Sequence, residues 1–370
     1  MTGRAVRSIG VAAPGRPVIL EDVEPAPGDG QAWLHTLWSG ISAGTEVALV
    51  RGTDPHHQVG WDRELRSFGA GSRLSGYPVA GLGYMEVARV TESRTRALAE
   101  GSLVAVAYGH RTGRCIDPAG TVVIPVPDDL DPVLGIYLAQ MGPVCVNGLL
   151  HAAAALAGPA AGVDGGVRDR RVLVTGAGVV GLLSALLAVR HGAAEVVVAE
   201  PSPERRAVAE ALGLVAVDDT DGQAWRAVKD RWEHGRGDHG ADLVLQCRGH
   251  DASLATALKS LRPQGLVVEL GFHQGGASRV RLGEEFHHNG LALVCAQILR
   301  VPRGMADTWP QEALAAVTLD LLRHRGDDVL RHVVTDEIPF EDGPALLADL
   351  AARRLPSPPL QAVLRCDEHD

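Results

Sequence analysis

The sequence predicts an α/β fold in which a doubly wound, six-stranded parallel sheet is joined to a β-rich domain. Residues 171–200 read as a buried strand, a glycine-rich turn, a helix and a second buried strand. Strand and helix patterns continue to alternate as far as residue 296, which is typical of a parallel sheet with helices on its faces. Residues 1–135 carry short valine-containing runs between glycines and prolines, which favours β structure.

The elements of the N-terminal region follow from these runs. Each run is rich in β-branched or aromatic residues and is bounded by turn residues. The expected strands are 32–38, 87–90, 103–107 and 122–126. Alanine-rich residues 131–157 predict helix, and the glycines of residues 158–166 predict a loop.

Beyond residue 200 the alternation divides the chain further. The expected helices are 203–212, 223–232 and 252–261, and the expected strands are 215–217, 241–246, 266–270 and 291–296. The C-terminal region predicts helices at 310–323 and 344–353 and a closing strand at 360–364. We expect three segments, 1–140, 141–302 and 303–370, of which the last folds back on the first.

The glycine-rich turn predicts a dinucleotide site. Gly176 permits a tight turn, Gly178 lets the backbone approach a diphosphate, and Gly181 lets the helix pack closely on the sheet. The helix begins at Val179 and Val180, and its unpaired amides favour phosphate. Glu200 follows about twenty residues later, where an acid accepts hydrogen bonds from the adenosine ribose. A glycine turn in an ordinary α/β core is the alternative.

Composition excludes several other classes of protein. The 370 residues have a net charge of −10, which argues against a nucleic-acid surface. The five cysteines are far apart and form no Cys-x-x-Cys motif, so a disulfide framework or a cysteine-cluster zinc lobe is not expected, and a reducing cytosol suits them. Arginines interrupt the N-terminal residues, so we expect no signal sequence. Arg190 and His191 break the most apolar stretch, residues 172–199, so we expect no membrane span there.

Several pieces of the chain, in this order, resemble the medium-chain dehydrogenase/reductase superfamily of alcohol, polyol and threonine dehydrogenases. They are residues 39–46 (SGISAGTE), 83–86 (GYME), the glycine motif, 242–249 (DLVLQCRG), 261–272 (LRPQGLVVELGF) and 338–342 (IPFED). The resemblance implies a GroES-like substrate domain, a Rossmann domain that holds a nicotinamide dinucleotide, and an active-site cleft between them. It also implies a homodimer or homotetramer assembled through the last strand of the nucleotide domain, and a small-molecule substrate. Charge and hydropathy, and not the resemblance, are the reasons to expect no nucleic-acid or membrane partner.

The chain departs from zinc-dependent members of this superfamily at the metal-ligand positions. Ser42 stands where they carry a cysteine, Tyr84 and Met85 stand where they carry a Gly-His-Glu histidine and glutamate, and Pro143 falls near the third ligand. Zinc is bound by thiolate, imidazole or carboxylate groups, which these residues lack. We therefore expect no zinc, and the motifs look most like a zinc-free branch with bacteriochlorophyllide-type dehydrogenases and oxidoreductases of specialised metabolism.

The cofactor is expected to be NAD(H) rather than NADP(H), because a carboxylate at Glu200 would repel a ribose 2′-phosphate. Arg205 matches a position that packs on the adenosine ribose in relatives, although it could instead hold a 2′-phosphate together with Arg206. Asn147 matches a position on the nicotinamide side. Further cofactor contacts are expected where strands end, since open α/β sheets bind ligands there; these are Cys247, Gly249, Leu270 and Gly271.

Without a metal, hydroxyl groups must stabilise the substrate oxygen during hydride transfer. Tyr84 is the first candidate for hydrogen-bond donor and general acid, with a buried core tyrosine as the alternative. Thr45 and Ser42 are candidate relay hydroxyls, with turn capping as the alternative, and Glu46 is expected to form an ion pair or a cap. A single well-placed donor stabilises such a transition state by about 3 kcal/mol.

Substrate contacts are expected from a polar insertion and from the end of a nearby strand. His56, His57 and Trp61 lie in the insertion, and His110 follows Tyr108. Solvated loop histidines are the alternative for each.

Three functions remain open at this point. The first is a metal-independent NAD(H)-dependent oxidoreductase acting on a secondary alcohol or ketone. The second is an NADPH-dependent enoyl or quinone reductase of the same superfamily, which Glu200 disfavours. The third is a nucleotide-binding scaffold without turnover.

Overall fold

The structure is a computed structural model that describes residues 3–69, 76–298 and 300–367. It divides the chain into two compact units. The first contains Met1–Gln140 and Val334–Asp370, and the second contains Met141–Val333. Each unit is described by itself below.

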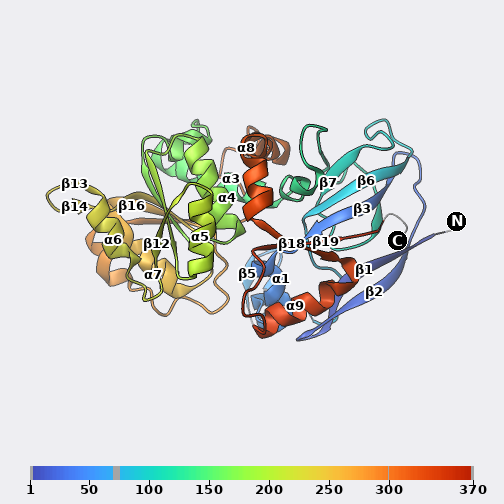
Figure 1. The fold of residues 1–370 in the computed structure, drawn as a ribbon, viewed down its shortest axis with the longest axis horizontal. Coiled ribbons are helices and arrows are strands. Elements are labelled where there is room, and N and C mark those ends of the chain that lie inside the picture. The colour runs from blue at the N-terminus through green and yellow to red at the C-terminus, as the bar shows by residue number, and fades with distance from the viewer. Residues whose placement is uncertain (1–2, 70–75, 299, 368–370) are drawn as a thin grey trace. The chain divides into compact units, whose positions relative to one another are not determined.

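The second unit is built around a parallel sheet, as the sequence predicts (Figure 1). Its described strands lie in the order β12-β11-β10-β15-β16-β17. They are β10 (Arg171–Thr175), β11 (Glu195–Glu200), β12 (Val215–Asp218), β15 (Ala241–Gln246), β16 (Leu261–Glu269) and β17 (Ala292–Cys295). The order reverses direction at β10, and the carboxyl edge at such a point is where open α/β sheets bind ligands.

Helices cover both faces of this sheet because its strands alternate apolar residues on each side. Leu173, Val197 and Val244 share one apolar cluster with residues of α6 (Ala224–Arg231) and α7 (Asp251–Ser260). The helices linking the first strands are α4 (Val179–Arg190) and α5 (Pro203–Ala211). The hairpin β13 (Glu233–Gly235) and β14 (Asp238–His239) follows α6.

Two longer helices complete the second unit. They are α3 (Met141–Leu156) and α8 (Gln311–His332), which pack against each other. A Cβ on Gly142 would lie 2.1 Å from Cγ2 of Thr318, so the two helices meet at a glycine. The expected boundary at residue 303 differs from this division, because the contact of α8 with α3 keeps residues 303–333 in the second unit.

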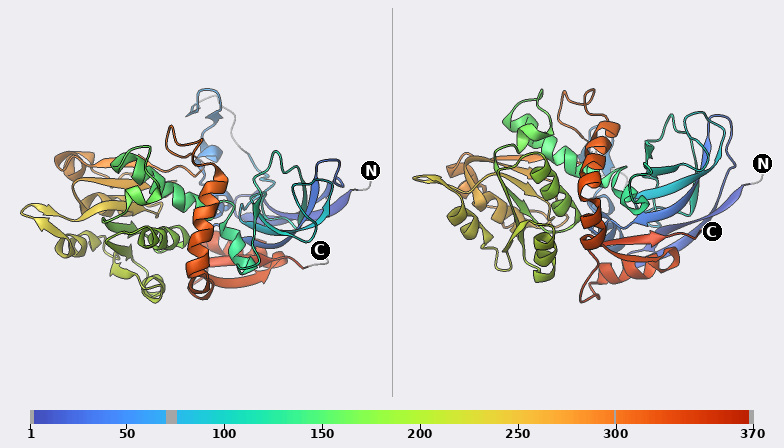
Figure 2. Two further views of the ribbon diagram at one scale, coloured as in Figure 1. Left: turned by 90° about the horizontal axis from the view of Figure 1, so that it is seen from above. Right: turned by 45° about the horizontal axis from the view of Figure 1, so that its top comes forward.

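The first unit is mostly β structure (Figure 2). Strands β1 (Arg4–Ala13) and β2 (Arg16–Glu24) pair antiparallel. A larger sheet has the order β18-β19-β3-β6-β7-β9, with β8 paired to β3. Its strands are β3 (Ala32–Gly40), β6 (Glu86–Ser93), β7 (Leu103–Val106), β8 (Gly113–Ile116), β9 (Ile124–Pro125), β18 (Val334–Pro339) and β19 (Gln361–Arg365).

The C-terminal residues belong to this first unit. Strand β19 lies between β18 and β3, and α9 (Gly343–Ala352) packs against α1 (Ala43–Arg51). Phe340 and Leu364 are fully buried in one cluster with Ile9. A short insertion contains α2 (Pro55–Gln58), β4 (Trp61–Asp62) and β5 (Ser67–Phe68). Within the described ranges, no helix combines the length and the apolar character needed to cross a membrane.

Candidate active site

The glycine-rich turn after β10 has the close geometry that its sequence predicts. Gly176 has a φ of +97°, a left-handed conformation that other residues adopt only with strain. A Cβ on Gly181 would lie 1.8 Å from the carbonyl oxygen of Gly176, so no side chain fits there. The start of α4 is therefore held directly against the end of β10.

The same turn leaves backbone N–H groups at the start of α4 that a ligand can contact. Gly178 is the N-cap of α4, and a Cβ placed on it would meet, among the described residues, a guanidinium nitrogen of Arg205 at 4.0 Å. The free amides at the start of this helix and its dipole favour an anion. The turn therefore fits a dinucleotide diphosphate.

Glu200 ends β11 as a buried carboxylate beside this turn. One carboxylate oxygen accepts from the backbone N–H of Ala177 at 2.8 Å, and the other accepts from the N–H of Ser202 at 3.0 Å. These bonds fix the carboxylate, and each oxygen retains a lone pair for a ribose hydroxyl. The residue is therefore placed and oriented as an acceptor.

The two neighbouring arginines have different roles. Arg206 donates to the carbonyl oxygens of Glu200 and Pro201 and pairs with Asp218 at 3.0 Å. Its guanidinium is thus engaged within its own unit. The guanidinium of Arg205 instead lies beside Gly178.

The other expected cofactor residues lie in the second unit, in varied surroundings. Asn147 donates from Nδ2 to the carbonyl oxygens of Gln297 and Arg300, both at 3.1 Å, so its N–H groups are already used. Burial raises the pKa of the Cys247 thiol well above its usual value, so it is no nucleophile. Leu270 packs on Gly148 of α3.

Gly249 and Gly271 bring two strand ends into contact. A Cβ on Gly249 would lie 2.3 Å from the carbonyl oxygen of Phe272, and a Cβ on Gly271 would lie 2.9 Å from the carbonyl carbon of Arg248. The turns that follow β15 and β16 therefore touch through their backbones.

In the first unit, the hydroxyls of Ser42 and Tyr84 form a hydrogen bond. Ser42 is the N-cap of α1, yet its side chain makes no capping bond, which leaves the hydroxyl for Tyr84. Tyr84 is half-buried and not enclosed in the core. Thr45 lies one turn away on α1, and its backbone N–H donates to the carbonyl of Ser42 at 3.1 Å.

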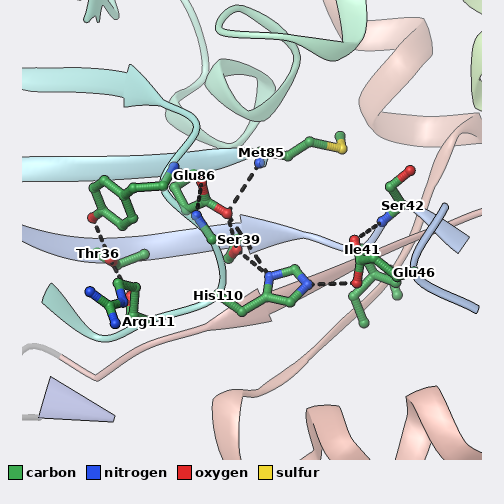
Figure 3. A network of polar contacts seen from close by, with 12 residues as sticks. Thr36, Ser39, Ile41, Ser42, Glu46, Met85, Glu86, His110 and Arg111 are labelled. Carbon is green, nitrogen blue, oxygen red and sulfur yellow. Dashed lines mark hydrogen bonds and ion pairs between the residues drawn. The ribbon is translucent and has the colours of Figure 1, made fainter. Parts of the chain in front are cut away.

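A buried network of polar side chains holds this turn in place (Figure 3). Glu46 accepts from the N–H of Ser42 at 2.6 Å and from His110 Nε2 at 2.7 Å. The other ring nitrogen, Nδ1, lies 2.6 Å from the hydroxyl of Ser39, which donates to Glu86 at 2.9 Å. Glu46 therefore caps α1 and pairs with a histidine.

The protonation of His110 follows from its partners. When the hydroxyl of Ser39 donates to Glu86, Nδ1 must donate to Ser39, and Nε2 donates to a carboxylate, so both nitrogens carry protons. Burial by itself would lower the pKa of His110, but the ion pair and hydrogen bond with Glu46 and the charge of Glu86 raise it. Burial raises the pKa of Glu86. A substrate contact does not fit His110, because its side chain is completely buried and both nitrogens are used.

The insertion places the other histidines in an aromatic cluster. His56 pairs with Asp54 at 2.9 Å and lies edge-on to Trp61 and Phe68. His57 stacks on Tyr77, with ring centroids 4.7 Å apart. Both histidines therefore contact aromatic rings within the first unit and are not isolated loop side chains.

Comparison with known proteins finds similar dehydrogenases for part of the chain. A family model for zinc-binding dehydrogenases matches residues 179–318. D-guloside 3-dehydrogenase of Escherichia coli is 26% identical over 187 residues, which cover 48% of this chain and 52% of that protein. L-threonine 3-dehydrogenase of Pyrococcus furiosus is 34% identical over 124 residues, which cover 33% of this chain and 32% of that protein. The chain thus spans about half, or a third, of the length of these curated relatives.

Solved structures resemble the whole chain. An alcohol dehydrogenase of Thermotoga maritima has a TM-score of 0.74 at 17% identity and covers 99% of this chain and 100% of its own. A zinc-binding dehydrogenase of Sinorhizobium meliloti bound to NADP has a TM-score of 0.72 at 17% identity, with 98% and 99% coverage. These likenesses show that the chain has the fold of these dehydrogenases. The predicted α/β fold with a parallel six-stranded sheet is confirmed.

The matched family model describes zinc-binding dehydrogenases, so the residues at the expected ligand positions decide whether an ion fits. Ser42 and Tyr84 offer hydroxyls, Met85 offers a fully buried thioether, and Pro143 offers no side-chain donor. In the part of the chain that the structure describes, no three His, Cys, Asp or Glu side chains are arranged to hold an ion. The donor set does not fit a catalytic zinc ion.

Two groups of residues were not predicted. Glu86 is an acid within a buried strand, and Glu269 and Gln246 end apolar strand runs. The sequence carried a signal for each of them, namely a charged or amide residue within or at the end of an apolar run. Such a residue requires a buried partner.

Proposed function

We propose that the protein is a metal-independent, NAD(H)-dependent oxidoreductase that moves a hydride between nicotinamide and a secondary alcohol or ketone. The observation that carries this proposal is the hydrogen bond between Ser42 and Tyr84, at the positions where zinc-dependent relatives have metal ligands. The matched relatives are named as dehydrogenases, which supports the reaction class.

The proposed reaction needs a bound cofactor and hydroxyl groups of the chain. Bound NAD(H) supplies or accepts the hydride. The Tyr84 hydroxyl donates a hydrogen bond, and then a proton, to the substrate oxygen as negative charge develops there. Ser42 orients that hydroxyl and passes a proton to or from it. The network of Glu46, His110 and Glu86 keeps Ser42 in place.

The choice of NAD(H) rests on Glu200. Its buried carboxylate is fixed beside the glycine turn by two backbone N–H groups. A ribose 2′-phosphate would bring a second negative charge to this carboxylate, whereas a 2′-hydroxyl can donate to it. Arg205 then contacts the adenosine side of the cofactor.

Replacing Tyr84 tests the catalytic assignment. We expect Tyr84→Phe to lower kcat by about a hundredfold or more, with a small change in KM, because the lost bond forms mainly in the transition state. Tyr108→Phe is the matched control, since its hydroxyl bonds to Thr36 at 2.6 Å and does not contact Ser42. Equal turnover in the Tyr84 variant and the wild type would remove this residue from the mechanism.

A substrate panel separates the remaining functions. Ketones and conjugated alkenes are offered with NADH and NADPH. Reduction of alkenes with NADPH alone would favour the enoyl or quinone reductase, and turnover of no compound would favour the scaffold. Assembly as a homodimer or homotetramer, a cytoplasmic location and a role in bacterial specialised metabolism remain parts of this proposal.

A further inference from the structure

Three polar side chains are gathered at the carboxyl edge of the sheet in the second unit, where β15 and β16 end. They are Gln246, Glu269 and His273. Gln246 is fully buried and Glu269 is 8% exposed, although a buried carboxylate costs free energy unless it is well paired. The reaction proposed above uses none of the three.

Hydrogen bonds to both the oxygen and the nitrogen of its side-chain amide fix Gln246. Its oxygen accepts from the hydroxyl of Thr175 at 2.8 Å and from the N–H of Arg248 at 2.7 Å. Its nitrogen donates to the carbonyl of Arg248 at 2.6 Å and contacts both carboxylate oxygens of Glu269 at 3.2 Å. One amide hydrogen is therefore used by the carbonyl of Arg248, and the other is directed toward Glu269 and toward Nε2 of His273, which lies at 3.3 Å.

Both carboxylate oxygens of Glu269 also have partners. One of its oxygens accepts from the N–H of Gly271 at 2.7 Å, and the other lies 3.0 Å from Nε2 of His273. Since an ionised carboxylate only accepts, Nε2 of His273 carries a proton that points at Glu269. Both the position and the orientation of the imidazole are set by this bond.

The second ring nitrogen of His273 is left without a partner. Nδ1 is buried and forms no hydrogen bond to any of the residues that the structure describes. The side chain as a whole is 16% exposed, so the ring lies near the surface of the unit. The hydrogen bond with Glu269 raises the pKa of His273 against the opposing effect of burial, which favours a protonated, donating Nδ1. A buried donor without an acceptor is costly, so this nitrogen calls for a ligand oxygen.

The place of His273 along the sheet edge indicates which ligand atom it meets. Glu200 ends β11, the glycine turn follows β10, and His273 follows β16, two strands beyond β10 on the opposite side from β11. Strands are spaced about 4.8 Å apart, so β11 and β16 are separated by about 14 Å along this edge. A dinucleotide with its adenosine at Glu200 and its diphosphate at the glycine turn directs its other nucleoside toward β15 and β16.

We propose that Nδ1 of His273 donates a hydrogen bond to the ribose of the nicotinamide half of the cofactor. Glu269 and Gln246 act as positioning residues for that imidazole. This inference rests on the proposed function, because it takes NAD(H) as the ligand. It assigns a binding residue to the half of the cofactor from which the hydride leaves.

Titration calorimetry on the full chain with NADH and with ADP tests this assignment. ADP contains the adenosine and diphosphate but lacks the nicotinamide nucleoside. His273→Ala should weaken NADH binding by about tenfold to a hundredfold, as expected for a bond to a charged donor, and should change ADP binding less than about twofold. His273→Gln keeps an N–H donor and should bind NADH more tightly than the alanine variant.

His288→Gln is the matched control, because His288 is an exposed histidine of the same unit that bonds to the carbonyls of Gly283 and Glu284. Unchanged NADH binding in both His273 variants would overturn the assignment while leaving the proposed function intact. Equal weakening of NADH and ADP would also overturn it, because a structural role affects both ligands. A wild-type protein that binds neither ligand would overturn both this inference and the proposed function.

Discussion

At the residue scale, charge is buried only where a partner fixes it. Glu200, Glu86 and Glu269 each accept a backbone N–H at 3.1 Å or less, and each lies at or beside the end of a strand. Such charge-assisted bonds are stronger than neutral ones and offset part of the desolvation cost. The functional side chains are therefore held rigidly before any ligand arrives.

Glu200→Gln tests cofactor choice at this scale. The amide keeps its size but loses the negative charge, so we expect NADH binding to weaken about tenfold and the preference for NADH over NADPH to shrink by a similar factor. Glu204→Gln is the matched control, because Glu204 is exposed on α5 and bonds to the hydroxyl of Ser202. An unchanged NADH-to-NADPH ratio in Glu200→Gln would contradict the role given to its charge.

The buried histidine predicts how stability depends on pH. The pKa of His110 is raised in the folded protein above its ordinary value of 6.5, so its contribution is complete below pH 6.5 and is lost as pH rises through the folded pKa. The raised pKa of Glu86 acts in the same direction. We therefore expect the free energy of unfolding to fall as pH rises above 6.5.

Denaturant unfolding of His110→Gln across this range provides the check. Glutamine does not titrate, so the variant should lose less stability than the wild type as pH rises. At pH 6.5 it should be less stable by about 3–5 kcal/mol, because Glu46 loses its buried partner. Parallel pH profiles for the two proteins would contradict the charged state assigned to His110.

The local role of a residue could be predicted from the sequence where only one residue type fits the backbone geometry. Gly176 and Gly181 indicated the turn correctly, because the left-handed φ of Gly176 and the 1.8 Å Cβ contact at Gly181 favour glycine alone. The partner of a polar side chain was not predictable in the same way. His110 meets Glu46 across 64 residues, and nothing local in the sequence signals that contact.

At the element scale, the glycine contact between α4 and β10 shapes the turn proposed to bind the cofactor. Gly181→Ala would put a methyl group 1.8 Å from the carbonyl oxygen of Gly176, which must push the helix away. We expect a loss of about 1–3 kcal/mol of stability and at least a tenfold loss of ADP affinity. Gly283→Ala is the control, since a Cβ there meets no described atom within 4 Å. Normal ADP binding by the Gly181 variant would show that this contact does not form the site.

Apolar runs predicted the central strands well and the element ends less well. The strand expected at 241–246 is β15 with the same bounds, because both its faces are buried. The helix expected at 310–323 extends to His332, because Gly326 lies buried inside it and does not end it. Helix α1 was not expected, since Gly44 and the β-branched residues around it disfavour helix locally. The cap from Glu46 overrides that preference.

At the scale of the whole molecule, the two units differ in how the chain builds them. The second unit uses one continuous stretch, Met141–Val333, whereas the first needs residues from both ends of the chain. Strand β19 pairs with β3 and β18 and supplies the fully buried Val363 and Leu364. The first unit therefore cannot be completed without the C-terminal residues.

Expression of the parts tests this division. Residues 141–333 alone should fold and bind ADP with an affinity close to that of the full chain, as measured by circular dichroism and calorimetry. Residues 1–140 alone should fail to unfold cooperatively, because β19 is missing from their sheet. Cooperative unfolding of residues 1–140 would contradict the role given to the C-terminal strand.

The central claim is that protein hydroxyls, and no metal, serve the substrate oxygen during hydride transfer from NADH. Its most direct test is transfer of deuterium from stereospecifically labelled NADH to a panel of ketones, using protein stripped of metal by a chelator. We expect the metal-free protein to transfer the label at the same rate as untreated protein. Transfer that stops on removal of metal and returns with stoichiometric zinc would contradict it.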